Sequence, residues 1–481
     1  MIAILVLLLV WLTGSALLRW IFPAPLRWSL HNVFLCSLGA GVGIGIASCL
    51  YFLCLGTIGP NLVVMAVVEG IAMAGILGLA ILSKRSGPEF EWAPGPAVPK
   101  YLTGLFLLAV AIGVTVFVVY TMNKPHGEWD AWSIWNLRAR FFVRGGQFWK
   151  DAFTSQLAWS HPDYPLLLPG IVAMLWTLAH TESTAAPIAV AFLFGMGTAG
   201  ILTGTLGILR GKAQAFIGGI LLIGTVSFVE NAANQYADIP LSFAILASLA
   251  LLCLQDRNPE DLRFSILAGL TAGFAAWTKN EGLMFLCVLV VARIIAMVRY
   301  GNRSAMLPQL LRFAAGSIPP LAVVAFFKLR FAPANDLMSR STHDIISHAT
   351  DFGRWVTTVE GFIKAAFVVG GFLVPLAVLM AGYWFLARFN VEARDRLSLG
   401  TLVVTLGLML IGDFAVYVLL AGDVAWQMNT SMERLFLQLW PAGLLAFFLA
   451  ANPPQLVASR AVPEKSKSVK RNPKAVRRAT L

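Results

Sequence analysis

The sequence predicts an all-α polytopic membrane protein. The chain of 481 residues is 58% hydrophobic and only 12% charged, whereas soluble domains are about 25% charged. Apolar runs of roughly 20 residues, long enough to cross a bilayer, recur from end to end. These runs are continuous rather than alternating, so we expect helices that satisfy their own backbone hydrogen bonds and not the strands of a barrel.

About 13 transmembrane helices are expected. The chain begins with an apolar run that has no basic residue before it, so we interpret this run as a retained span and not as a signal peptide. The expected spans are 1–19, 31–56, 61–83, 101–122, 184–209, 213–230, 237–255, 262–279, 281–299, 313–331, 364–387, 397–420 and 434–451.

Basic residues predict the orientation, because Lys and Arg concentrate in cytoplasmic loops. If the N-terminus is external and the spans alternate in direction, the span boundaries that carry Lys and Arg lie on the cytoplasmic side. The C-terminus is then cytoplasmic, and the expected membrane is the inner (plasma) membrane. The apolar segment 165–180 is then expected to be re-entrant or interfacial, because a full span there would reverse every later loop. An ordinary short span in a thinned bilayer remains the alternative.

Three parts are predicted. Residues 1–100 form an N-terminal three-helix membrane segment, and residues 101–451 form a catalytic transmembrane domain with an external loop at 123–183. Residues 452–481 form a basic, disordered cytoplasmic tail with eight Lys or Arg residues. Such a cluster beside a membrane favours anionic lipid, so the bilayer and not a nucleic acid is its expected partner.

The external loop is the longest polar break in the chain and holds the first candidate site. We expect an amphipathic interfacial helix over 130–144, ending at Gly145-Gly146, with Trp132 and Trp135 on its apolar face. Asp130 at its start is either a helix N-cap or a general base. Glu128 is an alternative base or a helper, and Arg138 and Arg140 would hold a substrate anion.

Further polar residues lie at other span boundaries expected on the same external side. Each also has a structural interpretation: turn residues in HPDYP, a helix-dipole contact for Asp238, a Lys–Glu pair, and an interfacial anchor at Glu433-Arg434. The functional interpretation is a substrate site built from His161, Asp163, Tyr164, Asp238, Lys279, Glu281 and Arg434. No spacing of His or Cys predicts a metal site or a disulfide framework.

Five short motifs, in this order, resemble one enzyme superfamily. They are Asp130 in EWDAW, Tyr164-Pro165-Leu166, Asp238-Ile239-Pro240, the segment from Thr278 to Gly282, and the segment from Arg434 to Pro441. Over about 101–450 the chain is similar to the GT-C membrane glycosyltransferases, in the polyprenyl-phosphate-sugar-dependent branch that includes protein O-mannosyltransferases and aminoarabinose transferases. One departure is Ala131, where the family's acidic motif commonly has a second acid.

The resemblance implies a GT-C-like fold and an inverting glycosyltransferase. The enzyme would move a hexosyl or pentosyl group from a polyprenyl-phosphate carrier to a hydroxyl of a glycan, lipid or protein. Asp130 would be catalytic, and Glu128 and Arg138 would join the substrate-binding residues named above. No cofactor is expected, and the question of a divalent metal stays open because no residue spacing indicates one. Two alternatives remain open: a secondary transporter or flippase, and a glycan ligase or polymerase that uses lipid-diphosphate donors.

Overall fold

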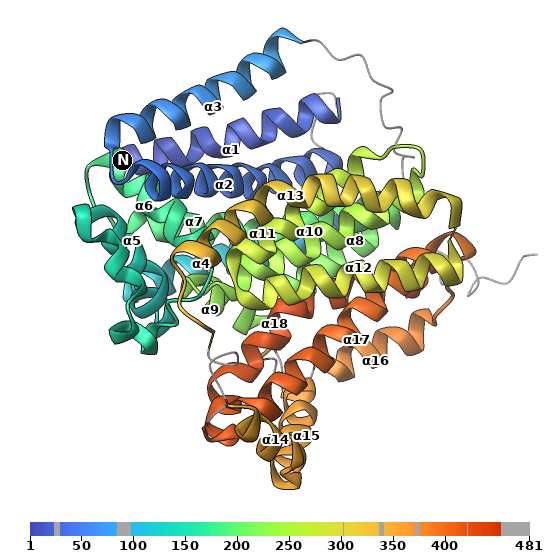
Figure 1. Cartoon of the computed structure of the whole chain (residues 1–481). Helices are drawn as coiled ribbons and strands as arrows, with labels where there is room; N and C mark the ends of the chain where they lie inside the picture. Colours follow the sequence, from blue (N-terminus) through green and yellow to red (C-terminus); the bar gives the residue numbers. More distant parts are fainter. Residues whose placement is uncertain are drawn as a thin grey trace, which may run out of the picture.

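The computed structural model describes residues 1–23, 29–83, 98–301, 303–335, 341–368, 370–371, 376–420 and 422–453. These residues form helices and contain no β-strand. The helices are α1 (Ile2–Ile21), α2 (Leu30–Ile58), α3 (Leu62–Leu82), α4 (Lys100–Asn123), α5 (Asn136–Arg144), α6 (Leu167–Ala179), α7 (Ala185–Leu209), α8 (Lys212–Ile223), α9 (Val226–Ala233), α10 (Asp238–Arg257), α11 (Arg263–Thr278), α12 (Asn280–Tyr300), α13 (Met306–Arg330), α14 (Thr342–Thr350), α15 (Phe352–Val368), α16 (Leu376–Ala387), α17 (Arg396–Leu419) and α18 (Val424–Ala450) (Figure 1).

Ten helices in the described part of the chain are long and apolar enough to cross a bilayer, and the bent pair α8–α9 would make an eleventh. The chain is therefore an all-helical polytopic membrane protein. The expected span 213–230 is this pair, which bends by 62°. The span expected at 262–279 is α11, with 16 residues. The span expected at 364–387 lies partly outside the described residues.

Helix α2 is largely buried in the bundle and has small residues facing several neighbours. A Cβ on Gly14 of α1 would lie 2.1 Å from the carbonyl oxygen of Gly39, and a Cβ on Gly41 would lie 2.1 Å from the ring of Phe243. Small residues let membrane helices approach closely, where hydrophobic burial alone does not drive association. Figure 1 shows α1, α2 and α3 side by side at one edge of the bundle, with α10 and α11 beneath them.

The external loop folds differently from the expected interfacial helix. A π-helical turn (Ala131–Trp135) leads into α5, which packs against α6 and a 3-10 segment (Gly146–Phe153). In the first half of the segment the polar residues Ser133 and Asn136 are 1% and 5% exposed, whereas in the second half the side chains of Arg140 and Arg144 are 29% and 66% exposed. The expected polar side therefore faces outward only in the second half, because neighbouring segments cover the first half.

Helix α6 occupies the segment where a re-entrant helix was expected. Its 13 residues reach about 20 Å, well short of the roughly 30 Å hydrocarbon thickness. It packs against α1, α2 and α5 and buries Leu167, Ile171 and Leu175. Its length fits an interfacial or re-entrant helix better than a full span.

The final helix begins about ten residues earlier than the expected span at 434–451. Helix α18 starts at Val424, and the Asp423 carboxylate caps it by accepting hydrogen bonds from the backbone amides of Ala425 and Trp426. An N-cap of this kind satisfies amides that have no partner within the helix. Arg434 consequently lies inside α18 and not at its entrance.

Candidate active site

Four separate segments bring charged side chains together at one end of the helix bundle. The Arg434 guanidinium of α18 pairs with the Asp130 carboxylate beyond α4. The same Arg434 Nη1 lies 3.8 Å from Oδ2 of Asp238. Lys279 Nζ lies 3.1 Å from Oδ1 of Asp238 and 2.8 Å from Oε1 of Glu281. These five residues are called the central cluster below.

Asp130 is positioned by a tight turn after α4. Gly127 has φ +73°, and a Cβ there would lie 2.6 Å from the Asn234 carbonyl oxygen, so the turn requires glycine. The Glu128 amide then donates to that carbonyl at 3.2 Å, which fixes the loop against the α9–α10 connection. The Asp130 side chain makes no helix-capping hydrogen bond. Its carboxylate pairs with Arg434, so the N-cap alternative does not hold.

Asp238 anchors the cluster from the first residue of α10. It is 2% exposed, and the Gln438 side-chain amide donates to its Oδ1 at 2.6 Å. The helix N-terminus also favours a negative charge at this position. Asp238 therefore lies at the helix N-terminus, as the structural interpretation expected, and also belongs to the polar cluster of the functional interpretation.

Lys279 lies in the sharp connection from α11 to α12. A Cβ on Gly282 would lie 1.8 Å from the Ala275 carbonyl oxygen, so only glycine lets α12 start this close to the end of α11. Burial disfavours the ammonium, but the nearby carboxylates of Asp238 and Glu281 outweigh burial and raise the pKa of Lys279 above its ordinary value. Lys279 is thus held as a cation.

Aromatic rings line the cluster. The Arg434 guanidinium lies 4.8 Å from the Tyr236 ring centroid, within cation–π range. Burial and then the Asp130 charge raise the pKa of Tyr236 to about 12, so its phenol stays neutral. Tyr164 stacks on Trp135 and His161 at 5.7 and 4.9 Å, and Lys279 Nζ is 5.9 Å from the Tyr164 ring.

Several buried polar atoms of this region have no hydrogen-bond partner among the described residues. They include a donor, Nε of Arg434, and two acceptors, Oε2 of Glu281 and Oδ1 of Asn234. Most buried polar groups in proteins are paired, so unpaired ones call for an explanation such as a ligand or water. A ligand with both hydrogen-bond acceptors and donors would satisfy these atoms.

Asp163 belongs to a neighbouring network. Its Oδ2 accepts hydrogen bonds from the side-chain amides of Asn280 and Asn335 at 2.7 and 2.9 Å and lies 3.7 Å from Nζ of Lys328. Lys328 also donates to Oδ1 of Asn280 at 2.8 Å. The network ties the HPDYP turn to the start of α12 and to the end of its neighbour α13, beside Lys279 and Glu281.

Arg138 differs from its expected role as a holder of a substrate anion. Its guanidinium is 1% exposed and donates to the carbonyl oxygens of Ile134, Ser160 and His161. Burial lowers the pKa of Arg138 to about 10, against the opposing effect of Asp163, and the side chain remains charged at neutral pH. Arg138 therefore holds the turn that carries His161, because carbonyl oxygens already take the hydrogen bonds that an anion would need.

Glu128 and the histidines of α14 also lie apart from the central cluster. The Glu128 carboxylate pairs with Lys124 one helical turn earlier and is 36% exposed. His343 and His348 lie in α14, and the described residues contain no group of three or more His, Cys, Asp or Glu side chains suited to a metal ion. All five cysteines are free.

Sequence reasoning missed three contributors, Tyr236, Gln438 and Asp413. Asp413 of α17 is 3% exposed and lies within electrostatic reach of Glu281 and Lys279. An acid inside the apolar run of a span is itself a signal of function. This signal was present in the sequence for Asp413, although it was not used. Nothing in the sequence marked Gln438 or the face of Tyr236, since their roles depend on which helices meet.

The central cluster holds two cations, Lys279 and Arg434, and three acids, Asp130, Asp238 and Glu281, so its formal charge is +2 − 3 = −1. It can bind an anion at the cations and accept a proton at a carboxylate. The fold and this cluster define an all-helical membrane protein with a buried ionic site at one end of its bundle. No family model matches the chain, and no curated protein or solved structure matches it either.

Proposed function

We propose that the protein is a glycosyltransferase that moves a sugar from a polyprenyl-phosphate carrier to an acceptor hydroxyl on a glycan, lipid or protein. The observation that carries the proposal is the pairing of Asp130 with Arg434, beside Lys279, where four separate segments of the chain meet. A carboxylate and two cations in one buried site supply a base and a phosphate contact. The resemblance of the ordered motifs to the GT-C superfamily supports the same assignment.

The donor phosphate would bind at Arg434 and Lys279. Arg434 has one unpaired buried donor, Nε, and presents Nη1 to two carboxylates. A phosphate that approaches Arg434 competes with Asp130 for the guanidinium, because planar bidentate contacts to phosphate are strong. Donor binding would therefore release the Asp130 carboxylate, which loses its cation partner and becomes a better base.

The reaction would be a single displacement. The acceptor oxygen attacks the anomeric carbon, the bond from that carbon to the phosphate oxygen breaks, and its electron pair stays on the phosphate. Asp130 takes the acceptor proton as the new bond forms. Lys279 and Arg434 stabilise the charge that grows on the leaving phosphate. Attack from the face opposite the phosphate inverts the anomeric carbon.

Purified protein with a synthetic polyprenyl-phosphate sugar and a mixture of acceptor hydroxyls tests the proposal. We expect transfer by the wild type and a loss of transfer in Asp130→Asn, which keeps the side-chain shape. Arg144→Ala, which removes an exposed pair with Glu182, is the matched control and should transfer normally. Wild-type-like transfer by Asp130→Asn would remove the assignment of the base.

The same assay separates the donor classes. A lipid-diphosphate donor used in preference to the monophosphate would indicate a glycan ligase or polymerase instead. The proposed location is the inner (plasma) membrane with the central cluster on the extracytoplasmic side, the N-terminus outside and the C-terminus in the cytoplasm. Single cysteines placed near Lys124 and near Arg257 would then react with an impermeant thiol reagent from outside and from inside, respectively.

A secondary transporter or flippase is the second candidate, favoured by one observation. Glu69 in α3 and Asp413 in α17 are buried acids within candidate spans, 2% and 3% exposed. Intramembrane acids are typical of transport pathways. Substrate uptake into liposomes without any bond cleavage would support transport, whereas a covalent product would support transfer.

A further inference from the structure

The N-terminal helices contain a buried acid that the central cluster does not use. Glu69 is the eighth residue of the 21-residue helix α3, about 5 Å from its midpoint. Glu69 is 2% exposed, although only 17% of the apolar window of α3 is buried inside the protein. The carboxyl group therefore faces inward, toward α1 and α2, from a helix that is otherwise largely open to lipid.

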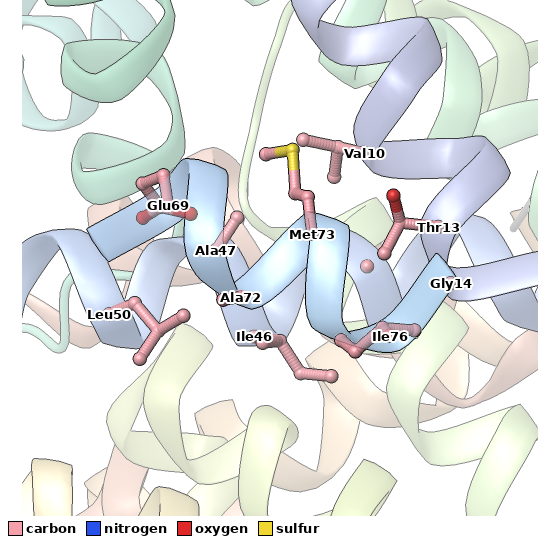
Figure 2. Close-up of a pocket in the computed structure, with 11 residues that line it drawn as sticks. Val10, Thr13, Gly14, Ile46, Ala47, Leu50, Glu69, Ala72, Met73 and Ile76 are labelled. Carbon is pink, nitrogen blue, oxygen red and sulfur yellow. The ribbon is translucent and has the colours of Figure 1, made fainter. Parts of the chain in front are cut away.

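Among the described residues, the surroundings of Glu69 offer no counter-ion. Figure 2 shows Glu69 of α3 beside Ala47 and Leu50 of α2 at one end of a cavity, Met73 beside Val10 in its middle, and Thr13 of α1 at its other end. The residues that line this cavity include no Lys, Arg or His, and the titratable groups within electrostatic reach are the thiols of Cys49 and Cys54 on α2. Oε1 of Glu69 has no hydrogen-bond partner among the described residues.

Burying an unpaired carboxyl group in this way costs free energy unless a bound proton and a hydrogen-bond partner compensate for it. An ionised carboxylate without a cation in the hydrocarbon region costs several kcal/mol, so the stable form here is the neutral acid. A neutral acid still needs hydrogen-bond partners. The cavity has a volume of ≈ 20 Å³, which is room for about one water molecule.

We propose that Glu69 is a proton-binding site inside the membrane, whose carboxyl holds an exchangeable proton next to a single water molecule between α1, α2 and α3. The ligand is the proton itself. The carboxyl is neutral with the proton bound, and the cavity water carries the proton to or from it. This site is independent of the proposed glycosyl transfer, since neither a donor nor an acceptor is involved.

Infrared spectroscopy on the full chain in liposomes tests the site. A protonated carboxyl has a carbonyl stretch separate from the amide and carboxylate bands. We expect such a band in the wild type, its loss in the isosteric Glu69→Gln, and its return at a shifted position in Glu69→Asp. Asp413→Asn is the matched control, because it removes another buried acid within a candidate span and should leave the Glu69 band in place.

Exchange of the wild type into D₂O distinguishes a proton site from a sealed structural acid. A shift of the Glu69 band within minutes supports the proposal. A band that does not shift, or no band that Glu69→Gln removes, overturns it. The wild-type measurement does not depend on the folding of any variant.

Chemical modification gives an independent readout. A lipid-soluble carbodiimide adds the carboxyl O–H across its C=N bond, and the acyl group then moves to nitrogen to give a stable N-acylurea, with no atom lost. We expect this added mass on the peptide that contains Glu69. Absence of the adduct from that peptide, or modification of the same peptide in Glu69→Gln, would count against the site.

Discussion

The two ends of the helix bundle both bury ionic groups, but they use them differently. Helix α10 connects the two ends: Asp238 at its start belongs to the central cluster, and Arg257 at its other end, about 30 Å away, pairs with Asp395. Asp395 is 1% exposed and also lies 3.2 Å from Arg210. Nearby, Arg293 pairs with Asp256.

At the Asp395 end the ionic groups are extensively bonded to neighbouring polar groups. Arg210 also donates to the Ala451 carbonyl oxygen at 2.6 Å, and Ser398 donates to Asp256 at 2.7 Å. Arg293 adds hydrogen bonds to Gln309 and Thr401. Buried charges with this many partners fix how helices dock. We interpret this end as structural.

The central cluster has more acids than cations, unpaired buried atoms and aromatic walls. Asp130 and Arg434 keep 20% and 21% exposure of their side chains. The comparison teaches that a buried ion pair alone does not mark an active site. What distinguishes the central cluster from the Asp395 end is its excess of acids over cations together with its aromatic walls.

The largest expected effect is on transfer, in Asp130→Asn. If Asp130 is the base, its loss lowers kcat roughly 100- to 10,000-fold, the range typical of general acid–base catalysis. Steady-state rates with a polyprenyl-phosphate sugar check this expectation. The melting temperature should change little, since the Asp130 pair is partly exposed; a large drop would instead place Asp130 with the structural ion pairs.

Asp395→Asn should give the opposite result. It leaves Arg210, whose side chain is 2% exposed, without its buried counter-ion and should lower the free energy of unfolding by about 3 kcal/mol. Unfolding in mixed detergent micelles measures the loss. The kcat of the protein that remains folded should equal that of the wild type, and a selective loss of kcat would contradict the division into two ends.

Arg434→Gln should raise the KM for the donor more than it lowers kcat. The variant removes a charged hydrogen bond to phosphate, worth roughly 10- to 100-fold in kcat/KM. Arg434→Lys should restore part of this loss, because it returns the charge without the planar geometry. Equal kinetics of the two variants would show that Arg434 does not contact the phosphate.

The pH dependence of stability sharpens the assignment of Lys279. Because the pKa of Lys279 is raised in the folded state, its contribution is fully present below the unfolded pKa of about 10.4. The contribution is lost as pH rises through the higher folded pKa. The stability difference between the wild type and Lys279→Met should therefore stay constant from about pH 7 to 10. A decline of this stability difference within that pH range would mean that the neighbouring carboxylates do not raise the pKa of Lys279.

The smallest expected effect belongs to the network around Asp163. Asn335→Ala removes one amide donor at 2.9 Å and leaves Asn280 and Lys328 in place, so we expect a loss of about 1 kcal/mol of stability and little change in kcat. Asn280→Ala, which removes the link to both Asp163 and Lys328, should raise KM as well. If Asn335→Ala and Asn280→Ala had identical effects on stability and KM, the network around Asp163 would have no part in substrate binding.

The sequence by itself determined the class of the molecule. Composition and the length of apolar runs depend only on neighbouring residues, so they predicted a polytopic helical membrane protein and located most of the spans. They also marked Asp130, Asp238, Lys279, Glu281 and Arg434 as polar residues at span boundaries. The roles assigned to these residues stay predictions.

Only the tertiary structure decided which atoms meet. Asp130 and Arg434 are 304 residues apart. They pair because α18 packs in the bundle so that Arg434 lies next to the turn that holds Asp130. Arg138 looked equivalent to Arg434 in the sequence, yet it is buried against carbonyl oxygens. Side chains of the same type take different partners because helix packing, and not local sequence, sets which groups they face.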